Sequence, residues 1–185
     1  FSTIPAIVEL WIRRQSWHRA DKSLTLQMQA ACRRLSGGDK EKGQALFKTV
    51  KPGTCTTDAA MACAPLLHAR NMIEPERRAV EKHGQTLVAD LPGYEYCVNT
   101  PGLSAFTLFA LIGECPGRNY RSFLDFETWS RVWKRFGVAT IDGEKQRKMI
   151  GAEGIRHGFN PARRALLFTI GAALMKTEGP YRDLY

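Results

Sequence analysis

The chain has 185 residues, of which 44% are hydrophobic and 24% charged, a composition that is ordinary for a folded protein with a buried core. Its 27 Lys and Arg residues outnumber its 18 Asp and Glu residues, and the net charge of +9 favours a polyanionic partner. The longest apolar runs, 105–113 and 165–175, are shorter than the roughly 18 to 20 residues that span a bilayer, so a transmembrane protein is excluded and no membrane partner is expected.

Neither the start of the chain nor its cysteines indicate export. No secretory leader pattern is present, and because the first residue is Phe1 we expect the chain to be part of a longer reading frame. The five cysteines have no CxxC pairing and the four histidines are scattered, so we expect free thiols in a reducing cytoplasm, no disulfide framework and no metal site.

A long first helix is predicted from near Pro5 to Leu35, with Ser2 or Thr3 as its cap. Its apolar residues recur at spacings of three, four and seven: Ile7, Leu10, Trp17, Leu24, Met28, Ala31 and Leu35. Gly37 and Gly38 should end this helix, and Asp39 can cap a short second one that reaches Val50. The basic residues of the first helix are interpreted as a solvated outer face, with DNA contact as the alternative: Arg13, Arg14, Arg19, Lys22, Arg33 and Arg34.

A second long helix is predicted over 58–89, with Pro75 expected to kink it. Leu66, Ile73, Val80 and Leu87 lie seven residues apart, a heptad stripe that is typical of a packed helix face. Two long helices joined by a short insert most simply form an antiparallel hairpin. We therefore assign residues 1–90 to a helical hairpin or coiled-coil linker.

The sequence Leu91, Pro92, Gly93 breaks the helical pattern and predicts a domain boundary, after which residues 91–185 form a compact domain of short helices. Helices are expected near 87–99, 104–114, 126–136 and 161–176, with loops at 116–119 and 139–158, and no strand of useful length. The predicted fold class is therefore all-α. Three aromatic residues at helical spacing are expected in the core rather than as base-stacking groups: Trp129, Trp133 and Phe136.

The residues before the apolar helix 104–114 form a Pro-Gly turn followed by a capping serine. In a helix-hairpin-helix module such a turn presents backbone N–H groups to a DNA phosphate at the positive end of a helix dipole. Gly102 and Ser104 are therefore candidate DNA-binding residues. A plain corner between two helices, without a ligand, is the alternative.

The segment 134–164 holds eight cations against three carboxylates. If these side chains share a face, they would neutralise several phosphates and give tight, salt-dependent binding without sequence preference. The alternative is a solvated surface with scattered charges. The candidate DNA-binding residues of this segment are Lys134, Arg135, Lys145, Arg147, Lys148, Arg156, Arg163 and Arg164.

Six stretches of the C-terminal half stand in a characteristic order: 100–104, 111–114, 120–123, 133–138, 154–158 and 163–166. In this order they resemble the C-terminal domain of the insertion-sequence transposases related to the Piv DNA invertase, a family that includes RNA-guided bridge recombinases. The resemblance covers about residues 91–176, and the preceding helix pair resembles the coiled-coil linker of the same proteins.

The resemblance implies a bacterial, nucleoid-associated protein that binds double-stranded DNA, assembles at least as a homodimer and can work with a guide RNA. It also implies a RuvC-like nuclease domain that binds Mg²⁺ and that this chain does not contain, so no cofactor is expected in the chain itself. In the family, the serine of a Ser-Gly motif attacks DNA; the matching place here holds Asp142 and Gly143. An aspartate cannot perform that step in the same way, so no catalytic residue is assigned.

Three functions remain open on the sequence. The first is DNA binding as part of a transposase or site-specific recombinase that acts in transposition or recombination. The second is an active recombinase, which needs a nucleophile and metal-binding acids from an N-terminal region or a partner chain. The third is an alternative from a different class: a non-catalytic helical interaction or scaffold module that self-associates.

Overall fold

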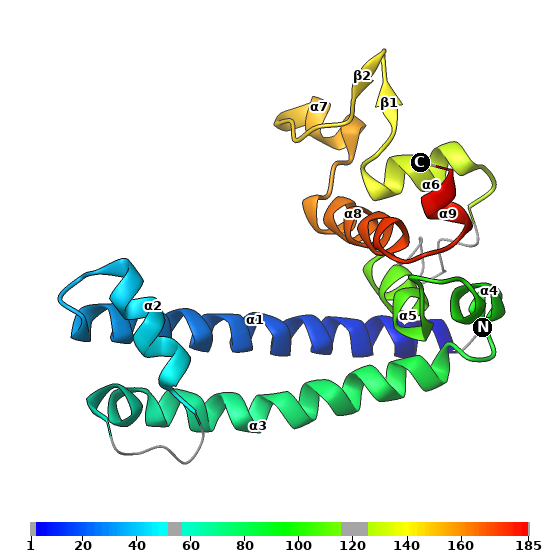
Figure 1. The fold of residues 1–185 in the computed structure, drawn as a ribbon. Coiled ribbons are helices and arrows are strands. Elements are labelled where there is room, and N and C mark those ends of the chain that lie inside the picture. Colours follow the sequence, from blue (N-terminus) through cyan, green and yellow to red (C-terminus); the bar gives the residue numbers. More distant parts are fainter. Residues whose placement is uncertain (1–2, 52–56, 116–125, 185) are drawn as a thin grey trace. The chain divides into compact units, whose positions relative to one another are not determined.

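The computed structural model describes residues 3–51, 57–115 and 126–184, and it is 74% helical with one small two-stranded sheet (Figure 1). The all-α fold class predicted from the sequence is confirmed. The chain divides into two compact units: a helical-pair unit, residues 13–80, and a C-terminal unit, residues 1–12 together with 81–185. The domain boundary at Leu91 stays a prediction, since both compact units include parts of the two long helices.

Local signals account for the ends of the first two helices. Helix α1 spans Thr3–Leu35, and its C-terminal carbonyls are closed by Gly37 and Gly38, which both adopt positive φ; the Gly38 N–H donates to the Arg33 carbonyl at 2.9 Å. Helix α2 spans Lys40–Thr49 and is capped by Asp39, whose carboxylate accepts from the N–H groups of Glu41 and Lys42.

Helix α3, Asp58–Leu87, packs beside α1 and α2 in the helical-pair unit and continues through Pro65 and Pro75. The buried residues of this unit are Met28 and Cys32 from α1 with Ala59 and Cys63 from α3. An ion pair between Asp21 and Arg70, at 2.7 Å, joins the same two helices further along. Since residue numbers rise on one helix as they fall on the other, α1 and α3 run antiparallel within this unit.

The described cysteines are free and buried. The sulfur atoms of Cys32 and Cys63 lie 3.8 Å apart, and burial together with the hydrogen bond to Cys32 raises the pKa of the Cys63 thiol to about 11. Such a thiol is almost entirely protonated at neutral pH and is a weak nucleophile. Within residues 3–51, 57–115 and 126–184, no group of His, Cys, Asp and Glu side chains could hold a metal ion.

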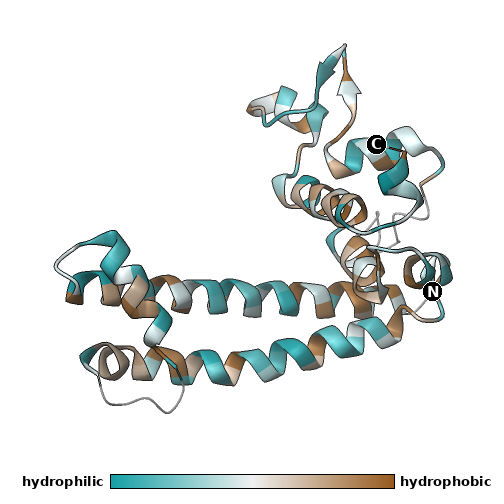
Figure 2. Cartoon of the chain, in the orientation of Figure 1, coloured by the Kyte–Doolittle hydropathy of each residue, from teal (hydrophilic) through white to brown (hydrophobic). Residues whose placement is uncertain are grey.

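The core of the C-terminal unit forms between the start of α1 and helix α5, Ala105–Glu114, which is apolar along most of its length (Figure 2). Trp11 lies edge-on to Phe109, with ring centroids 5.3 Å apart, and its indole N–H donates to Glu114 at 2.8 Å. Two glycines allow this approach: a Cβ at Gly113 would lie 2.3 Å from Trp11, and one at Gly84 would lie 2.4 Å from Phe109. Packing in this core therefore depends on the absence of side chains at Gly84 and Gly113 as well as on the hydrophobicity of its residues.

The rest of the unit consists of short elements: α4 (Tyr94–Asn99), α6 (Trp129–Phe136), β1 (Thr140–Ile141), β2 (Glu144–Lys145), α7 (Gly151–His157), α8 (Pro161–Lys176) and α9 (Pro180–Asp183). Strands β1 and β2 pair antiparallel, Thr140 opposite Lys145, around Asp142 and Gly143. Both turn residues have positive φ, 52° and 82°, as a two-residue hairpin turn requires. The expectation of a loop over 139–158 is therefore wrong.

Helix α8 is apolar on most of its surface, yet none of its residues is fully buried (Figure 2). Phe168, at its centre, is 79% exposed. Over the ranges that the structure describes, no helix combines the length and the apolar character needed to cross a membrane.

Candidate nucleic-acid interface

The predicted phosphate-binding turn lies between α4 and α5, where Gly102 has a φ of +88°. A Cβ at this position would lie 2.9 Å from the carbonyl oxygen of Ala173 and 3.0 Å from the Cα of Leu174, so the turn packs against the C-terminal half of α8. The close approach of Gly102 to the α8 backbone and its positive φ together explain why this position holds a glycine. A phosphate contact by Gly102 stays a prediction.

Ser104 is the N-cap residue of α5 and is exposed. Its backbone N–H donates to the Thr107 hydroxyl at 3.1 Å, and the two hydroxyl oxygens lie 3.4 Å apart. Ser104 and Thr107 thus form a capping box that fixes where the helix begins. The same residues leave the positive end of the helix dipole at the surface, which is compatible with an anion but also with water.

Three of the predicted cations, Arg135, Arg163 and Arg164, contact groups on or beside other helices of this unit. The Arg163 guanidinium donates to the Glu114 carbonyl at 2.9 Å, at the C-terminal end of α5. Burial and the nearby charge of Arg135 lower the pKa of Arg163. Burial also raises the pKa of the adjacent Cys115 thiol, although Arg135 and Arg163 oppose that shift. A carbonyl at a helix end prefers a cation, so Arg163 joins α8 to α5.

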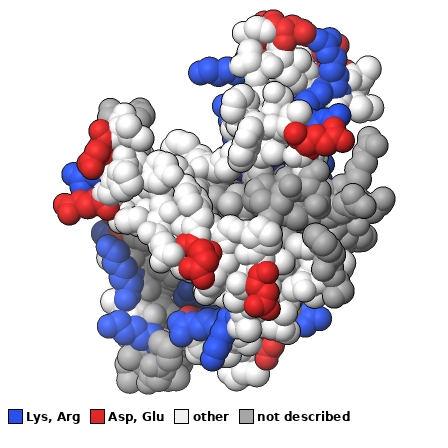
Figure 3. Space-filling view, turned by 90° about the vertical axis from the view of Figure 1, so that its right-hand side faces the viewer, with Lys and Arg blue, Asp and Glu red and all other residues white. Residues whose placement is uncertain are grey.

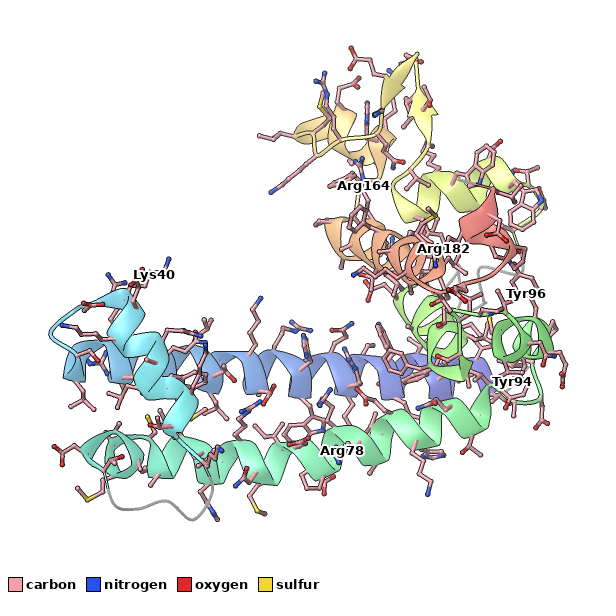
Figure 4. The ribbon with its side chains drawn as sticks, in the orientation of Figure 1. Lys40, Arg78, Tyr94, Tyr96, Arg164 and Arg182 are labelled. Carbon is pink, nitrogen blue, oxygen red and sulfur yellow. The ribbon has the colours of Figure 1, made fainter. Side chains whose placement is uncertain are left out.

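Arg164, at the start of α8 (Figure 4), belongs to a second network of contacts. This network is centred on Gln146, which is 1% exposed. The Gln146 amide donates to the carbonyls of Lys134 and His157, and its side-chain oxygen accepts from the Ala139 N–H at 3.3 Å. Arg164 donates to the Gln146 carbonyl at 3.1 Å and lies over the Phe159 ring. One buried amide therefore connects α6, β1 and α7, and Arg164 connects them to α8.

The remaining predicted cations are exposed, as Arg164 also is, and four of them lie on the segment 139–158. Arg147 pairs with Glu144 at 3.0 Å, and Arg156 pairs with Asp142 and, at 3.5 Å, with Glu153. The side-chain ammonium groups of Lys145 and Lys148 have no ion-pair or hydrogen-bond partner among the described residues, and the same holds for that of Lys134 at the end of α6. Cationic and acidic side chains alternate over the uppermost part of Figure 3.

The predicted DNA-binding residues therefore do not all lie on one surface. Gly102 meets α8 at Ala173, whereas Arg163 and Arg164 stand on the first turn of that helix, roughly 15 Å away along its axis at 1.5 Å per residue. Ion pairs place Arg147 beside Glu144 of β2 and Arg156 of α7 beside Asp142 of the hairpin turn. Lys145 lies on β2, and Lys148 lies between β2 and α7.

The prediction that Trp129 and Trp133 of α6 lie in the core is wrong. Phe136 is in the core, 2% exposed, as expected, but Trp129 and Trp133 are 73% and 55% exposed. The reason lies at the end of the helix: Gly137, which closes α6, packs near Phe159 and Arg164, whereas Trp129 lies two turns away at the other end. Helical spacing places the three residues on one side of α6. It does not show that the packing against Phe159 and Arg164 lies at the Gly137 end of the helix.

Comparisons of the chain with protein-family models, with curated proteins and with solved structures find no match. The transposase resemblance therefore depends only on the six sequence stretches between residues 100 and 166. The position that the resemblance gives to a nucleophilic serine, Asp142, lies in a hairpin turn and is paired with Arg156. Asp142 therefore has a structural role in the turn, and no nucleophile is assigned at this position.

Proposed function

We propose that this chain binds double-stranded DNA through the exposed cations of residues 134–156, as the DNA-binding part of a transposase-like or recombinase-like protein. The observation that carries the proposal is the exposure of Lys134, Lys145 and Lys148, whose side-chain ammonium groups have no ion-pair or hydrogen-bond partner within the described ranges. The net charge of +9 and the ordered transposase resemblance support it. No strand-cleaving step is part of the proposal, since no nucleophile is assigned.

Lysines without internal partners are suited to phosphate contact because nothing in the protein has to be released first. Each neutralised phosphate frees condensed counterions, so the logarithm of the affinity falls with the logarithm of salt concentration by about 0.9 per contact. Arg147 and Arg156 can exchange their exposed carboxylate partners for phosphates, since exposed ion pairs are worth only about 0 to 1 kcal/mol.

The triple variant Lys134→Gln/Lys145→Gln/Lys148→Gln is expected to bind a duplex of unrelated sequence roughly 10- to 100-fold more weakly near 0.1 M salt. The slope of the logarithm of affinity against the logarithm of salt concentration should become shallower by about 2.7, since three phosphate contacts are lost at about 0.9 each. Fluorescence anisotropy of a labelled duplex across a salt series measures both quantities. The matched control is Lys40→Gln/Lys42→Gln/Lys48→Gln on α2, which removes the same charge from the helical-pair unit.

Two outcomes contradict the proposal. One is a wild-type affinity that does not change between low and physiological salt. The other is an equal loss in the control variant, because net charge rather than the surface of residues 134–156 would then govern binding.

The second candidate function is a self-associating scaffold, and the exposed apolar residues of the C-terminal unit favour it. Phe168 on α8 and Ile155 on α7 are 79% and 85% exposed. Light scattering over a range of protein concentrations tests this candidate. A monomer at every concentration, in the wild type and in Phe168→Ser alike, would remove it.

A further inference from the structure

Trp129 and Trp133 form an exposed aromatic pair on α6. They are four residues apart, so their Cβ atoms lie about 5 to 6 Å from each other on one helix face. The side chains are 73% and 55% exposed, and neither indole N–H has a hydrogen-bond partner in the part of the chain that the structure describes. Tryptophan is highly buried on average, so two such side chains in contact with water on one short helix indicate a partner.

The charge of the helix indicates the chemistry of that partner. Helix α6 contains Arg131, Lys134 and Arg135 and no acidic residue. Lys134 is exposed and directly follows Trp133, and Arg131 pairs with the exposed Glu127 just before the helix. A cationic surface that carries flat aromatic groups complements a polyanion that also carries flat aromatic groups, which is a nucleic-acid strand.

We propose that Trp129 and Trp133 form a stacking platform for unpaired bases of DNA, so that this chain prefers duplexes with unpaired nucleotides over continuous duplexes. The inference rests on the proposed function, because the exposed lysines hold the backbone while the indoles take the bases. In a continuous duplex both faces of each base are covered by its neighbours, so an indole can stack only on a base that has left the helix.

The test compares the full chain on two probes: a labelled duplex and the same duplex with a bulge of three unpaired thymines. The variants are Trp129→Ala/Trp133→Ala, which removes the platform, and Trp129→Phe/Trp133→Phe, which keeps aromatic rings. Met61→Ala/Met72→Ala is the control, since it removes side chains that are similarly exposed, 58% and 64%, on α3 and outside residues 134–156. Circular dichroism checks that each variant keeps its helical content.

The wild type is expected to bind the bulged probe at least about fivefold more tightly than the continuous duplex, since stacking contributes roughly 5- to 100-fold per base. The alanine variant should lose this preference while its affinity for the continuous duplex changes less than about twofold. The phenylalanine variant should keep part of the preference, and the methionine control all of it. Tryptophan fluorescence should be quenched by the bulged probe in the wild type but not in the alanine variant.

Failure of this inference is distinct from failure of the proposed function. Salt-dependent duplex binding without a preference for the bulge overturns the stacking platform and leaves the proposed function intact. Binding of the bulged probe alone, lost in the alanine variant, supports the platform and overturns duplex binding. If neither probe binds, both are overturned. A change of oligomeric state in the alanine variant, with an unchanged preference for the bulge, assigns the tryptophans to a protein interface and also overturns the inference.

Discussion

The variant Gly113→Ala is expected to have a free energy of unfolding about 2 kcal/mol lower than that of the wild type. Helix propensity alone predicts the opposite, a gain of about 1 kcal/mol, because alanine is the better helix former. Packing decides the sign here. The new Cβ would lie 2.3 Å from the Cβ and Cγ of Trp11, so the indole has to move.

Trp11 has little room for that movement. It is 4% exposed, lies edge-on to Phe109 and donates to the Glu114 carboxylate at 2.8 Å. A displaced indole loses van der Waals contacts and weakens that hydrogen bond, at a cost of about 3 kcal/mol that exceeds the gain in propensity. Urea unfolding followed by circular dichroism measures the net effect.

The matched control is Gly171→Ala within α8. A Cβ at Gly171 meets no heavy atom within 4 Å, and its φ is not positive, so only the helix propensity should act and stability should rise by about 0.5 to 1 kcal/mol. A Gly113→Ala protein that is as stable as Gly171→Ala would show that the core around Trp11 is not tightly packed.

The second large effect is expected at Gln146. Gln146→Leu keeps the side-chain volume but leaves the Ala139 N–H and the carbonyls of Lys134 and His157 without this partner in a buried site. The Lys134 carbonyl still accepts from the Gly137 N–H, so two buried groups lose their partner. At about 1 to 3 kcal/mol for each group, a total loss of about 2 to 6 kcal/mol is expected. Gln44→Ala on the exposed face of α2 is the control and should change stability by less than about 0.5 kcal/mol.

Limited proteolysis locates the effect of the Gln146 substitution. Because this amide connects α6, β1 and α7, cleavage in the variant should begin within 139–158, and duplex binding should weaken with it since Lys145 and Lys148 lie on the same segment. Unchanged protease resistance together with unchanged stability would mean that the network around Gln146 is not what holds this segment.

The long elements were predictable because their signals are local. The end of α1 at Leu35 follows from Gly37 and Gly38, and the start of α2 follows from Asp39, each within a few residues of the feature it specifies. The hairpin of β1 and β2 was missed because strands of two residues show no alternation. The dipeptide Asp142-Gly143 was the available signal, since Asp-Gly favours a two-residue hairpin turn.

For the candidate DNA-binding surface, the sequence predicts the positive charge but not which cations are exposed. The sequence shows that Arg163 and Lys145 are cations in one basic segment, but not that Arg163 donates to the carbonyl of Glu114, 49 residues earlier, while Lys145 is exposed. Similarly, helical spacing could not separate Phe136 from Trp133, because burial depends on where a neighbouring element ends.

By itself the sequence determined the helical character of this protein, the ends of its first helices and its excess of positive charge, all of which depend on residues within one or two turns of each other. Only the tertiary structure decided which arginines are structural, that Gly113 must remain without a side chain beside Trp11, and that Trp129 and Trp133 are exposed. The physical reason is that burial and hydrogen bonding are set by segments far apart in the chain, whose approach is not encoded in local periodicity or in net charge.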